Sequence, residues 1–213
     1  MIKKEQILLY AVTDRTCLKD GQTLAEAVRL ALEGGVTLVQ LREKHMDKEE
    51  FIKSALEIKK ICREFNVPLI INDSIDVCLA ADADGVHLGQ GDMPIEQARK
   101  LLGNEKIIGI TARTPEQAAA AEKGGADYIG SGAIFGTFTK SDAKKMEPET
   151  LRKITSSVSI PVAAIGGITA ENADGLKGLG ISGAAVVSGI FAQDDIKAAA
   201  SRLKQKIMSL MGD

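Results

Sequence analysis

The chain has 213 residues, 45% of them hydrophobic, which is enough for one well-buried core, and we expect a single domain over residues 1–213. Its 27 basic and 29 acidic residues give a net charge of -2, which excludes the basic surface that binds nucleic acid or an anionic membrane. Three cysteines without metal-ligand spacing, and a first apolar run too short for a signal peptide or a membrane span, predict a cytoplasmic protein. We expect small-molecule partners, and the sequence leaves a homo-oligomer open.

Short runs rich in Ile, Val, Leu and Ala recur along the whole chain and predict β-strands. The runs are residues 7–13, 38–42, 69–72, 85–89, 107–111, 128–132, 161–166 and 184–188. Because these runs are apolar on both faces, they are typical of strands in a buried parallel sheet.

Amphipathic stretches alternate with these runs and predict helices. They are residues 23–33, 48–65, 74–81, 95–102, 115–123, 147–156, 171–179 and 195–208. Glycines at 34–35, 103, 124–125 and 180 stand where a helix commonly ends, and Thr114 before Pro115 suits an N-cap.

Eight strand–helix units in about 200 residues fit a (β/α)8 barrel. A doubly wound sheet is the alternative, but it would usually carry a glycine-rich fingerprint after its first strand. The sequence there is Thr13-Asp14-Arg15-Thr16, which is no such fingerprint. We therefore predict an α/β fold of the (β/α)8 TIM-barrel type.

Active sites of such barrels lie where the strands end and the following loops begin. The polar or small residues at these points form a compact set. They are Gln40, Arg42, Lys44, Asn72, Asp73, Asp92, Thr111, Gly166, Gly167 and Ser188.

Taken singly, many of these residues also have a structural explanation. Arg42 and Lys44 could form ordinary ion pairs at the rim, and Asp73 and Asp92 could be N-caps of the next helices. The small residues after strands seven and eight could be turn residues, although this is where barrels commonly bind phosphate. We interpret His87, in an apolar strand, as a hydrogen-bonded interior side chain and not as a ligand.

A long polar loop, residues 132–146, follows the sixth strand. It carries the hydroxyls of Thr137 and Thr139, the cation Lys140, and the aromatic rings of Phe135 and Phe138. Loops this long in small barrels are functional or disordered, and disorder alone does not explain two phenylalanines at the loop's start. We interpret the loop as a lid over a substrate.

The charges in this set indicate phosphate chemistry. Asp73 and Asp92, on adjacent strands, could hold one Mg2+, which prefers one or two carboxylates together with substrate phosphates. Arg42, Lys44 and Lys140 would neutralise the rest of a polyanion. The arrangement is typical of a site that stabilises a departing pyrophosphate without a protein nucleophile or general base.

With these residues in place, the chain resembles the thiamine phosphate synthase (thiamine-pyrophosphorylase) family over nearly its whole length. The matching motifs are Leu9-Tyr-Ala-Val-Thr-Asp14, Val39-Gln-Leu-Arg-Glu-Lys44, Ile70-Ile-Asn-Asp73, Ala83-Asp-Gly-Val-His-Leu-Gly-Gln90, Asp92-Met93-Pro94, Thr137-Phe-Thr-Lys140, Ile165-Gly-Gly-Ile168 and Val186-Val-Ser188. The resemblance implies that a hydroxymethylpyrimidine pyrophosphate and a thiazole phosphate are joined into thiamine phosphate and pyrophosphate. It implies a pyrimidinylmethyl cation that the thiazole nitrogen captures.

The resemblance also implies residue roles. Asp73 and Asp92 would bind Mg2+, and Arg42, Lys44, Thr111 and Lys140 would be catalytic. The substrate-binding residues implied by the resemblance are Gln40, Leu41, Arg42, Glu43, Lys44, Asn72, Thr111, Thr137, Phe138, Thr139, Lys140, Gly167, Val187 and Ser188.

Three positions depart from the family pattern. Thr111 stands where Ser is usual, Arg113 where His is usual, and Gly136 where Pro is common, which should loosen the lid.

Two other functions stay open. A thiazole tautomerase of the same superfamily would lack the complete Mg2+ and pyrophosphate set, and a non-catalytic thiamine-phosphate binding protein would tolerate its loss.

Overall fold

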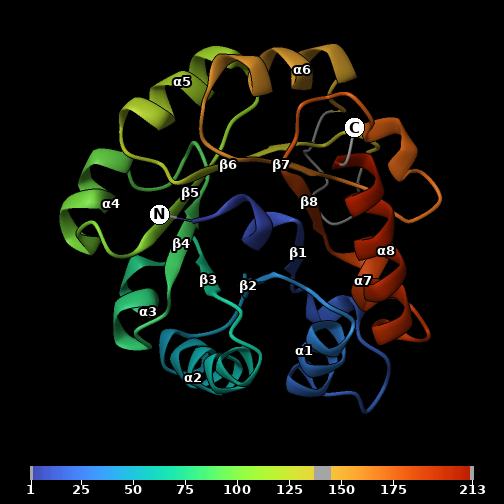
Figure 1. Ribbon diagram of the computed structural model, residues 1–213. Helices are drawn as coiled ribbons and strands as arrows, with labels where there is room; N and C mark the ends of the chain where they lie inside the picture. The colour runs from blue at the N-terminus through green and yellow to red at the C-terminus, as the bar shows by residue number, and fades with distance from the viewer. Residues whose placement is uncertain (1, 137–144, 212–213) are drawn as a thin grey trace.

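The computed structural model describes residues 2–136 and 145–211, and in that part of the chain eight parallel strands close into a barrel in chain order (Figure 1). Each strand pairs with the next, and the last pairs with the first, so that Leu9 lies opposite Ala184. The strands are β1 (Leu9–Val12), β2 (Leu38–Leu41), β3 (Leu69–Asn72), β4 (Gly85–Leu88), β5 (Ile107–Thr111), β6 (Tyr128–Gly132), β7 (Val162–Ile165) and β8 (Gly183–Val186). The predicted (β/α)8 TIM barrel is confirmed.

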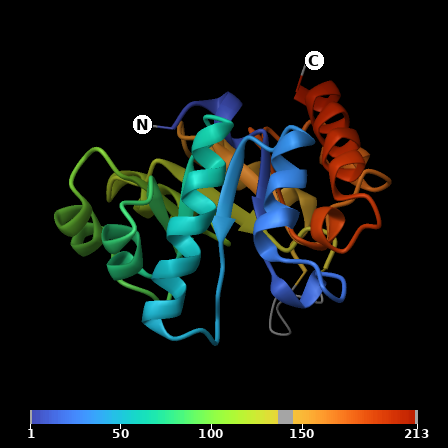
Figure 2. The ribbon, with the colours of Figure 1, turned by 90° about the horizontal axis from the view of Figure 1, so that it is seen from below.

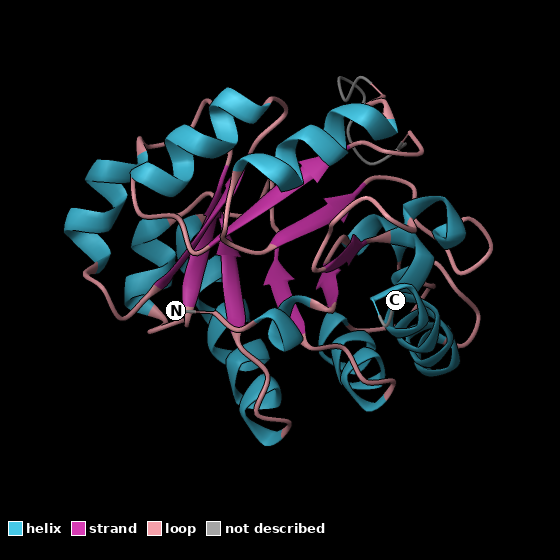
Figure 3. Ribbon diagram, turned by 45° about the horizontal axis from the view of Figure 1, so that its top comes forward, coloured by secondary structure: helices cyan, strands magenta, loops and turns pink. Residues whose placement is uncertain are grey.

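Helices surround the strands on the outside (Figure 3). The α-helices are α1 (Leu24–Glu33), α2 (Lys48–Glu64), α3 (Ile75–Ala80), α4 (Ile95–Leu102), α5 (Pro115–Lys123), α6 (Pro148–Ser157), α7 (Ser188–Phe191) and α8 (Ile196–Met211). Short 3-10 helices occur at η1 (Lys4–Ile7), η2 (Arg15–Cys17) and η3 (Ala173–Leu176).

The helix predicted for residues 171–179 is wrong, because only the four-residue 3-10 helix η3 forms there. Gly175 lies inside this segment, and Gly178 and Gly180 follow with φ of 70° and 73°. Glycine disfavours the helix interior, and two left-handed residues cannot continue a right-handed helix. The other predicted glycine stops hold, since Gly35 and Gly125 have φ of 96° and 95°.

Two apolar layers hold the barrel together. The outer layer lies between strands and helices and includes Leu41, Val86 and Ile129. The inner layer fills the barrel and includes Leu38 and Ile70. Residues of the N-terminal segment join this inner layer at the end where the strands begin, and Figure 2 shows this segment at the end opposite the strand arrowheads. The other end of the barrel is therefore the one with room for a pocket.

Ion pairs tie helices α2 and α4 to the loops that precede the strands. Asp82, just before β4, accepts hydrogen bonds from Lys59 and from Lys106. Arg99 donates to Asp127 at 2.7 Å, and both side chains are mostly buried. Charged networks at this end of a barrel serve stability, whereas polar groups at the other end serve chemistry.

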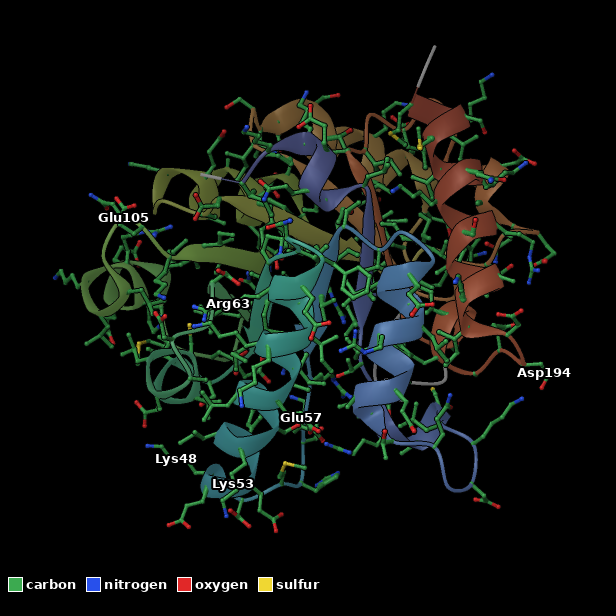
Figure 4. All side chains as sticks on the ribbon, turned by 60° about the horizontal axis from the view of Figure 1, so that its bottom comes forward. Lys48, Lys53, Glu57, Arg63, Glu105 and Asp194 are labelled. Carbon is green, nitrogen blue, oxygen red and sulfur yellow. The ribbon has the colours of Figure 1, made fainter. Side chains whose placement is uncertain are left out.

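The outer face of the helix ring is strongly charged. Figure 4 labels six exposed charged residues, among them Lys53 and Glu57 on α2. No helix in the described ranges 2–136 and 145–211 has the length and apolar character needed to span a membrane.

Candidate active site

A pocket opens at the C-terminal ends of the strands. Its lining brings together residues from five of the strand ends that the sequence had singled out. Those present in the lining are Gln40, Arg42, Asn72, Thr111, Gly167, Val187 and Ser188. Because these residues are far apart in the chain, the closed barrel is what places them around one cavity.

Three charged groups, Lys44, Asp73 and Asp92, lie outside the lining of this pocket but at the same end of the barrel, on the loops after β2, β3 and β4. The Lys44 Nζ lies 2.7 Å from Asp73 Oδ2, and the carboxyl groups of Asp73 and Asp92 interact with each other. The arrangement fits a small cation plus a phosphate, because it combines two acids on the loops after neighbouring strands with one lysine.

The pKa values of the two acids are shifted in opposite directions. Burial would raise the pKa of Asp73, but the hydrogen bonds from Lys44 and Asp92 outweigh it and leave that pKa lowered. The pKa of Asp92 is raised, chiefly by burial and by the neighbouring Asp73 carboxylate, against a hydrogen bond from the Gly89 N–H. Two carboxylates this close repel each other, and a divalent cation between them would remove that repulsion.

Neither acid caps a helix, which corrects the structural explanation. The N-cap of α3 is Ser74, whose side chain accepts from Val77 N, and α4 follows Pro94. Asp92 instead accepts from Gly89 N at 2.6 Å, which folds the loop after β4 back on itself. Asp73 has a left-handed φ of 61°, uncommon for a residue other than glycine and frequent at functional sites.

Arg42 lies beside the pocket with its guanidinium mostly buried. Its Nη1 is 3.5 Å from Asp14 Oδ2, and its backbone N–H donates to Thr13 Oγ1 at 3.0 Å. The Nε of Arg42 is buried without a hydrogen-bond partner. A buried cation with an unused donor can still accept an anionic ligand.

Leu41 and Glu43, the neighbours of Arg42, point elsewhere. The Leu41 side chain belongs to the outer apolar layer against the helices. The Glu43 carboxylate is bound by Arg15 at 2.7 Å and is itself mostly buried. Strand alternation explains the orientations of Leu41 and Glu43. Successive side chains of a strand point to opposite faces, so Gln40 and Arg42 face the pocket while Leu41 and Glu43 do not. A substrate contact of Leu41 or Glu43 would therefore use the backbone.

The loop after β7 is shaped by two glycines that line the pocket. Gly166 and Gly167 have φ of 106° and 64°, and a Cβ on Gly167 would lie 2.3 Å from the Gly136 carbonyl oxygen. Asn172 Nδ2 donates to the Gly167 carbonyl at 2.7 Å and fixes the loop. Ser188, the first residue of α7, lines the same pocket as these two glycines.

The predicted lid contacts Thr137, Phe138, Thr139 and Lys140 lie outside the described residues and stay predictions. Gly136, the last described residue before them, has a φ of 78°. Proline, common here in the family, is confined to φ near -65° and could not adopt this conformation.

A buried hydrogen-bond network lies at the base of the pocket and was not predicted as part of the site. Tyr10 OH lies 2.7 Å from Tyr128 OH, and Gln40 Nε2 donates to Tyr10 OH. The His87 ring bonds Tyr128 OH through Nδ1 and Thr111 Oγ1 through Nε2, both at 3.0 Å. The interpretation of His87 as a hydrogen-bonded interior residue is confirmed, yet His87 and Tyr10 also line the pocket.

No cluster of three or more His, Cys, Asp or Glu suited to a metal occurs in the ranges 2–136 and 145–211. The Asp73–Asp92 pair therefore offers two carboxylates, which is the ligand count that Mg2+ takes when substrate phosphates and water complete its shell.

Comparisons with known proteins agree with this geometry. Residues 9–190 match the family model described as thiamine monophosphate synthase. The thiamine-phosphate synthase of Ruminiclostridium cellulolyticum is 54% identical over 95% of this chain and 96% of its own length. That of Clostridium acetobutylicum is 50% identical over 92% of each chain. The solved thiamine phosphate pyrophosphorylase of Pyrococcus furiosus superposes with a TM-score of 0.90 at 39% identity, covering 98% of this chain and 99% of the other.

Proposed function

This chain belongs to the thiamine monophosphate synthase family, and from that membership we propose how its residues carry out the family's reaction. The chain is a transferase that makes thiamine phosphate. Its substrates would be 4-amino-5-hydroxymethyl-2-methylpyrimidine pyrophosphate and a thiazole phosphate, and its second product would be pyrophosphate.

One observation carries the mechanism: Lys44 pairs with Asp73, next to Asp92, on loops at the same mouth of the barrel as the pocket that Arg42 lines. Arg42 and Lys44 would bind the diphosphate of the pyrimidine substrate. Positive charge aimed at the departing oxygens lowers the barrier to C–O cleavage because the leaving group gains charge as it departs. No protein nucleophile is needed.

Asp73 and Asp92 would hold Mg2+, and the ion when bound would supply further neutralisation of the diphosphate. The pKa of Asp92 is raised chiefly by burial and also by the neighbouring Asp73 carboxylate, and this pair of adjacent acids is the feature of this structure that fits a divalent cation.

The pyrimidine ring would lie deeper in the pocket, against Gln40, Asn72 and Thr111. Gln40 and Asn72 are almost fully buried, so their amides can select the aminopyrimidine through its hydrogen-bonding pattern. Departure of pyrophosphate would leave a pyrimidinylmethyl cation, stabilised by the electron-rich ring and captured by the thiazole nitrogen.

The thiazole phosphate would bind on the opposite side of the same pocket, at Gly167, Val187 and Ser188. The left-handed conformation of Gly167 and the absence of a Cβ let backbone groups approach a phosphate closely. Thiazole nitrogen would then attack the cation across the pocket. Thr137, Phe138, Thr139 and Lys140 would complete this half of the site.

The test is a product measurement by mass spectrometry. Purified protein, both substrates and Mg2+ should give thiamine phosphate and pyrophosphate in equal amounts. Asp73→Asn and Asp92→Asn should each lower turnover by roughly a hundredfold or more, the scale of losing an electrostatic contact to a transition state. Asp76→Asn is the matched control, because Asp76 pairs with Lys48 at 2.6 Å on the exposed surface and should leave turnover unchanged.

The alternatives predict other outcomes. Isomerisation of the thiazole carboxylate phosphate without coupling to the pyrimidine would indicate a tautomerase. Binding of thiamine phosphate with no turnover would indicate a non-catalytic protein. Full coupling activity in excess EDTA would contradict the Mg2+ assignment.

A further inference from the structure

The buried network beneath the pocket has a direction, because one of its donors cannot act as an acceptor. Gln40 Nε2 can only donate, so Tyr10 OH accepts from it. Tyr10 then has one proton to donate, and Tyr128 OH at 2.7 Å is the acceptor available. The reverse order would leave the Tyr10 proton without an acceptor among the residues that the structure describes. Tyr10 is 1% exposed, so an unpaired proton there would be costly.

The same reasoning fixes the next link. Tyr128 is fully buried and accepts from Tyr10, so its own proton goes to His87 Nδ1 at 3.0 Å. Burial raises the pKa of both tyrosines, so both phenols keep their protons. An Nδ1 that accepts is unprotonated, and a neutral imidazole then carries its proton on Nε2.

The final link reaches the ligand pocket. The protonated Nε2 of His87 donates to Thr111 Oγ1 at 3.0 Å. The Thr111 hydroxyl therefore accepts from His87, and its own proton is left to point into the pocket that it lines.

Two strand glycines show that the barrel is built around these rings. A Cβ on Gly109 would lie 2.1 Å from Tyr128 Cζ, and a Cβ on Gly130 would lie 2.9 Å from His87 Cε1. Glycine weakens a strand interior, so these positions serve the close approach of the rings. Register explains the fit, since Gly109 pairs with both His87 and Tyr128 on the flanking strands.

We propose that Tyr10, Tyr128 and His87 form a one-way hydrogen-bond chain that turns the Thr111 hydroxyl into a donor toward the pyrimidine pyrophosphate. The proposal rests on the proposed function for the role of Thr111, and it adds Tyr128 and His87 as positioning residues. The group that Thr111 contacts must then offer an acceptor, either a ring nitrogen or an oxygen of the leaving group.

The first test measures the His87 tautomer in the ligand-free protein. The chain has two histidines, His45 and His87, so 15N-histidine labelling with His45→Gln for assignment gives an unambiguous NMR spectrum. The two-bond 1H–15N pattern should be that of the Nε2–H tautomer near neutral pH. In Tyr128→Phe, which keeps the ring but removes the donor, the pattern should shift toward a mixture of tautomers. An Nδ1–H or doubly protonated His87 in the wild type would overturn the chain.

The second test is a double-mutant cycle. Tyr128→Phe should lower kcat about tenfold, the effect of one misdirected hydrogen bond, with little change in KM for the thiazole phosphate. Thr111→Val, which removes the hydroxyl, should lower kcat at least as much. Thr111→Ser, which keeps the hydroxyl, should have a kcat near that of the wild type. Because Tyr128 acts through Thr111, the double variant Tyr128→Phe/Thr111→Val should be no slower than Thr111→Val alone. Additive losses would show that Tyr128 is merely structural.

The two tests separate the proposals. If the wild type forms no thiamine phosphate, the proposed function fails while the tautomer measurement still decides the direction of the chain. If the wild type is active but His87 has the other tautomer, only the further inference fails. Should Tyr128→Phe fail to fold, the wild-type spectrum alone is decisive.

Discussion

Asp14 should hold Arg42 in position for the diphosphate, and Asp14→Asn tests this. The side chains of Asp14 and Arg42 are 12% and 14% exposed, with 3.5 Å between Oδ2 and Nη1. Oδ1 of Asp14 accepts from the backbone N–H and the hydroxyl of Thr16. Asparagine can keep these bonds with its own Oδ1, so the substitution removes the charge that faces Arg42 and little else.

The distance between Arg42 Nη1 and Asp14 Oδ2 sets the expected size of the effect on diphosphate binding. At 3.5 Å and an effective dielectric constant of about 20, the attraction is about 4 to 5 kcal/mol, most of which desolvation cancels. We expect the net loss of orientation to weaken diphosphate binding by about 1 to 2 kcal/mol, a rise in KM of roughly tenfold. KM for the thiazole phosphate should stay constant, since that substrate binds across the pocket.

Steady-state kinetics with each substrate varied in turn measures the effect. Asp194→Asn is the control, because its partner Lys19 lies at 2.7 Å but Asp194 is fully exposed. If Asp14 merely neutralised Arg42, removing the carboxylate would strengthen binding of the diphosphate. A lowered or unchanged KM for the pyrimidine substrate would therefore refute the positioning role.

Three further predictions concern the rest of the barrel. Burial raises the pKa of Cys62 to about 12 and that of Cys78 to about 11. Neither thiol should therefore react with a disulfide reagent until the protein unfolds, and fast labelling of either thiol in the native protein would contradict this. Arg99→Met should lower the free energy of unfolding by about 3 kcal/mol, because it leaves the mostly buried Asp127 carboxylate without its cation, and a loss below about 1 kcal/mol in urea titration would show that solvent replaces the pair. The hydrogen bonds and charges of its two lysines lower the pKa of Asp82, so its contribution is present above the ordinary value of 3.8 and is lost as the pH falls through the lowered one. As the pH falls from 3.8 towards that lowered pKa, the free energy of unfolding of Asp82→Asn should accordingly fall less steeply than that of the wild type, and parallel curves would refute the linkage.

The architecture could be predicted because each signal that specifies it is local. Alternating apolar runs and amphipathic stretches give the strands and helices, and positions such as Gly35 and Gly125 mark the helix ends. The helix predicted for residues 171–179 from its apolar spacing is wrong, because Gly175, Gly178 and Gly180 interrupt that spacing. Glycines with left-handed φ outweigh a weak helical period.

Part of the candidate site was also predictable, because barrel geometry gathers strand ends at one mouth. Arg42, Asn72 and Thr111 were found in this way and do line the pocket. The acids were identified from neighbouring strands, although the mutual contact of Asp73 and Asp92 depends on loop conformations that no sequence period encodes.

The interior network could not be predicted from the same signals. Tyr10 and Tyr128 lie in apolar strands, where an aromatic ring is indistinguishable from ordinary core. A usable sign was present in Gly109 and Gly130, because glycine inside a strand indicates close approach of another group. Which ring fills that space depends on strand register, and register is a property of the closed barrel.

The central claim is that the diphosphate departs at the mouth formed by Arg42, Lys44, Asp73 and Asp92. A crystal structure with pyrophosphate and Mg2+ tests it most directly. The account predicts the diphosphate oxygens within hydrogen-bond distance of Arg42 and Lys44, and the cation bound to both carboxylates. Pyrophosphate bound at Gly167 and Ser188 instead, with the two acids left uncoordinated, would contradict it.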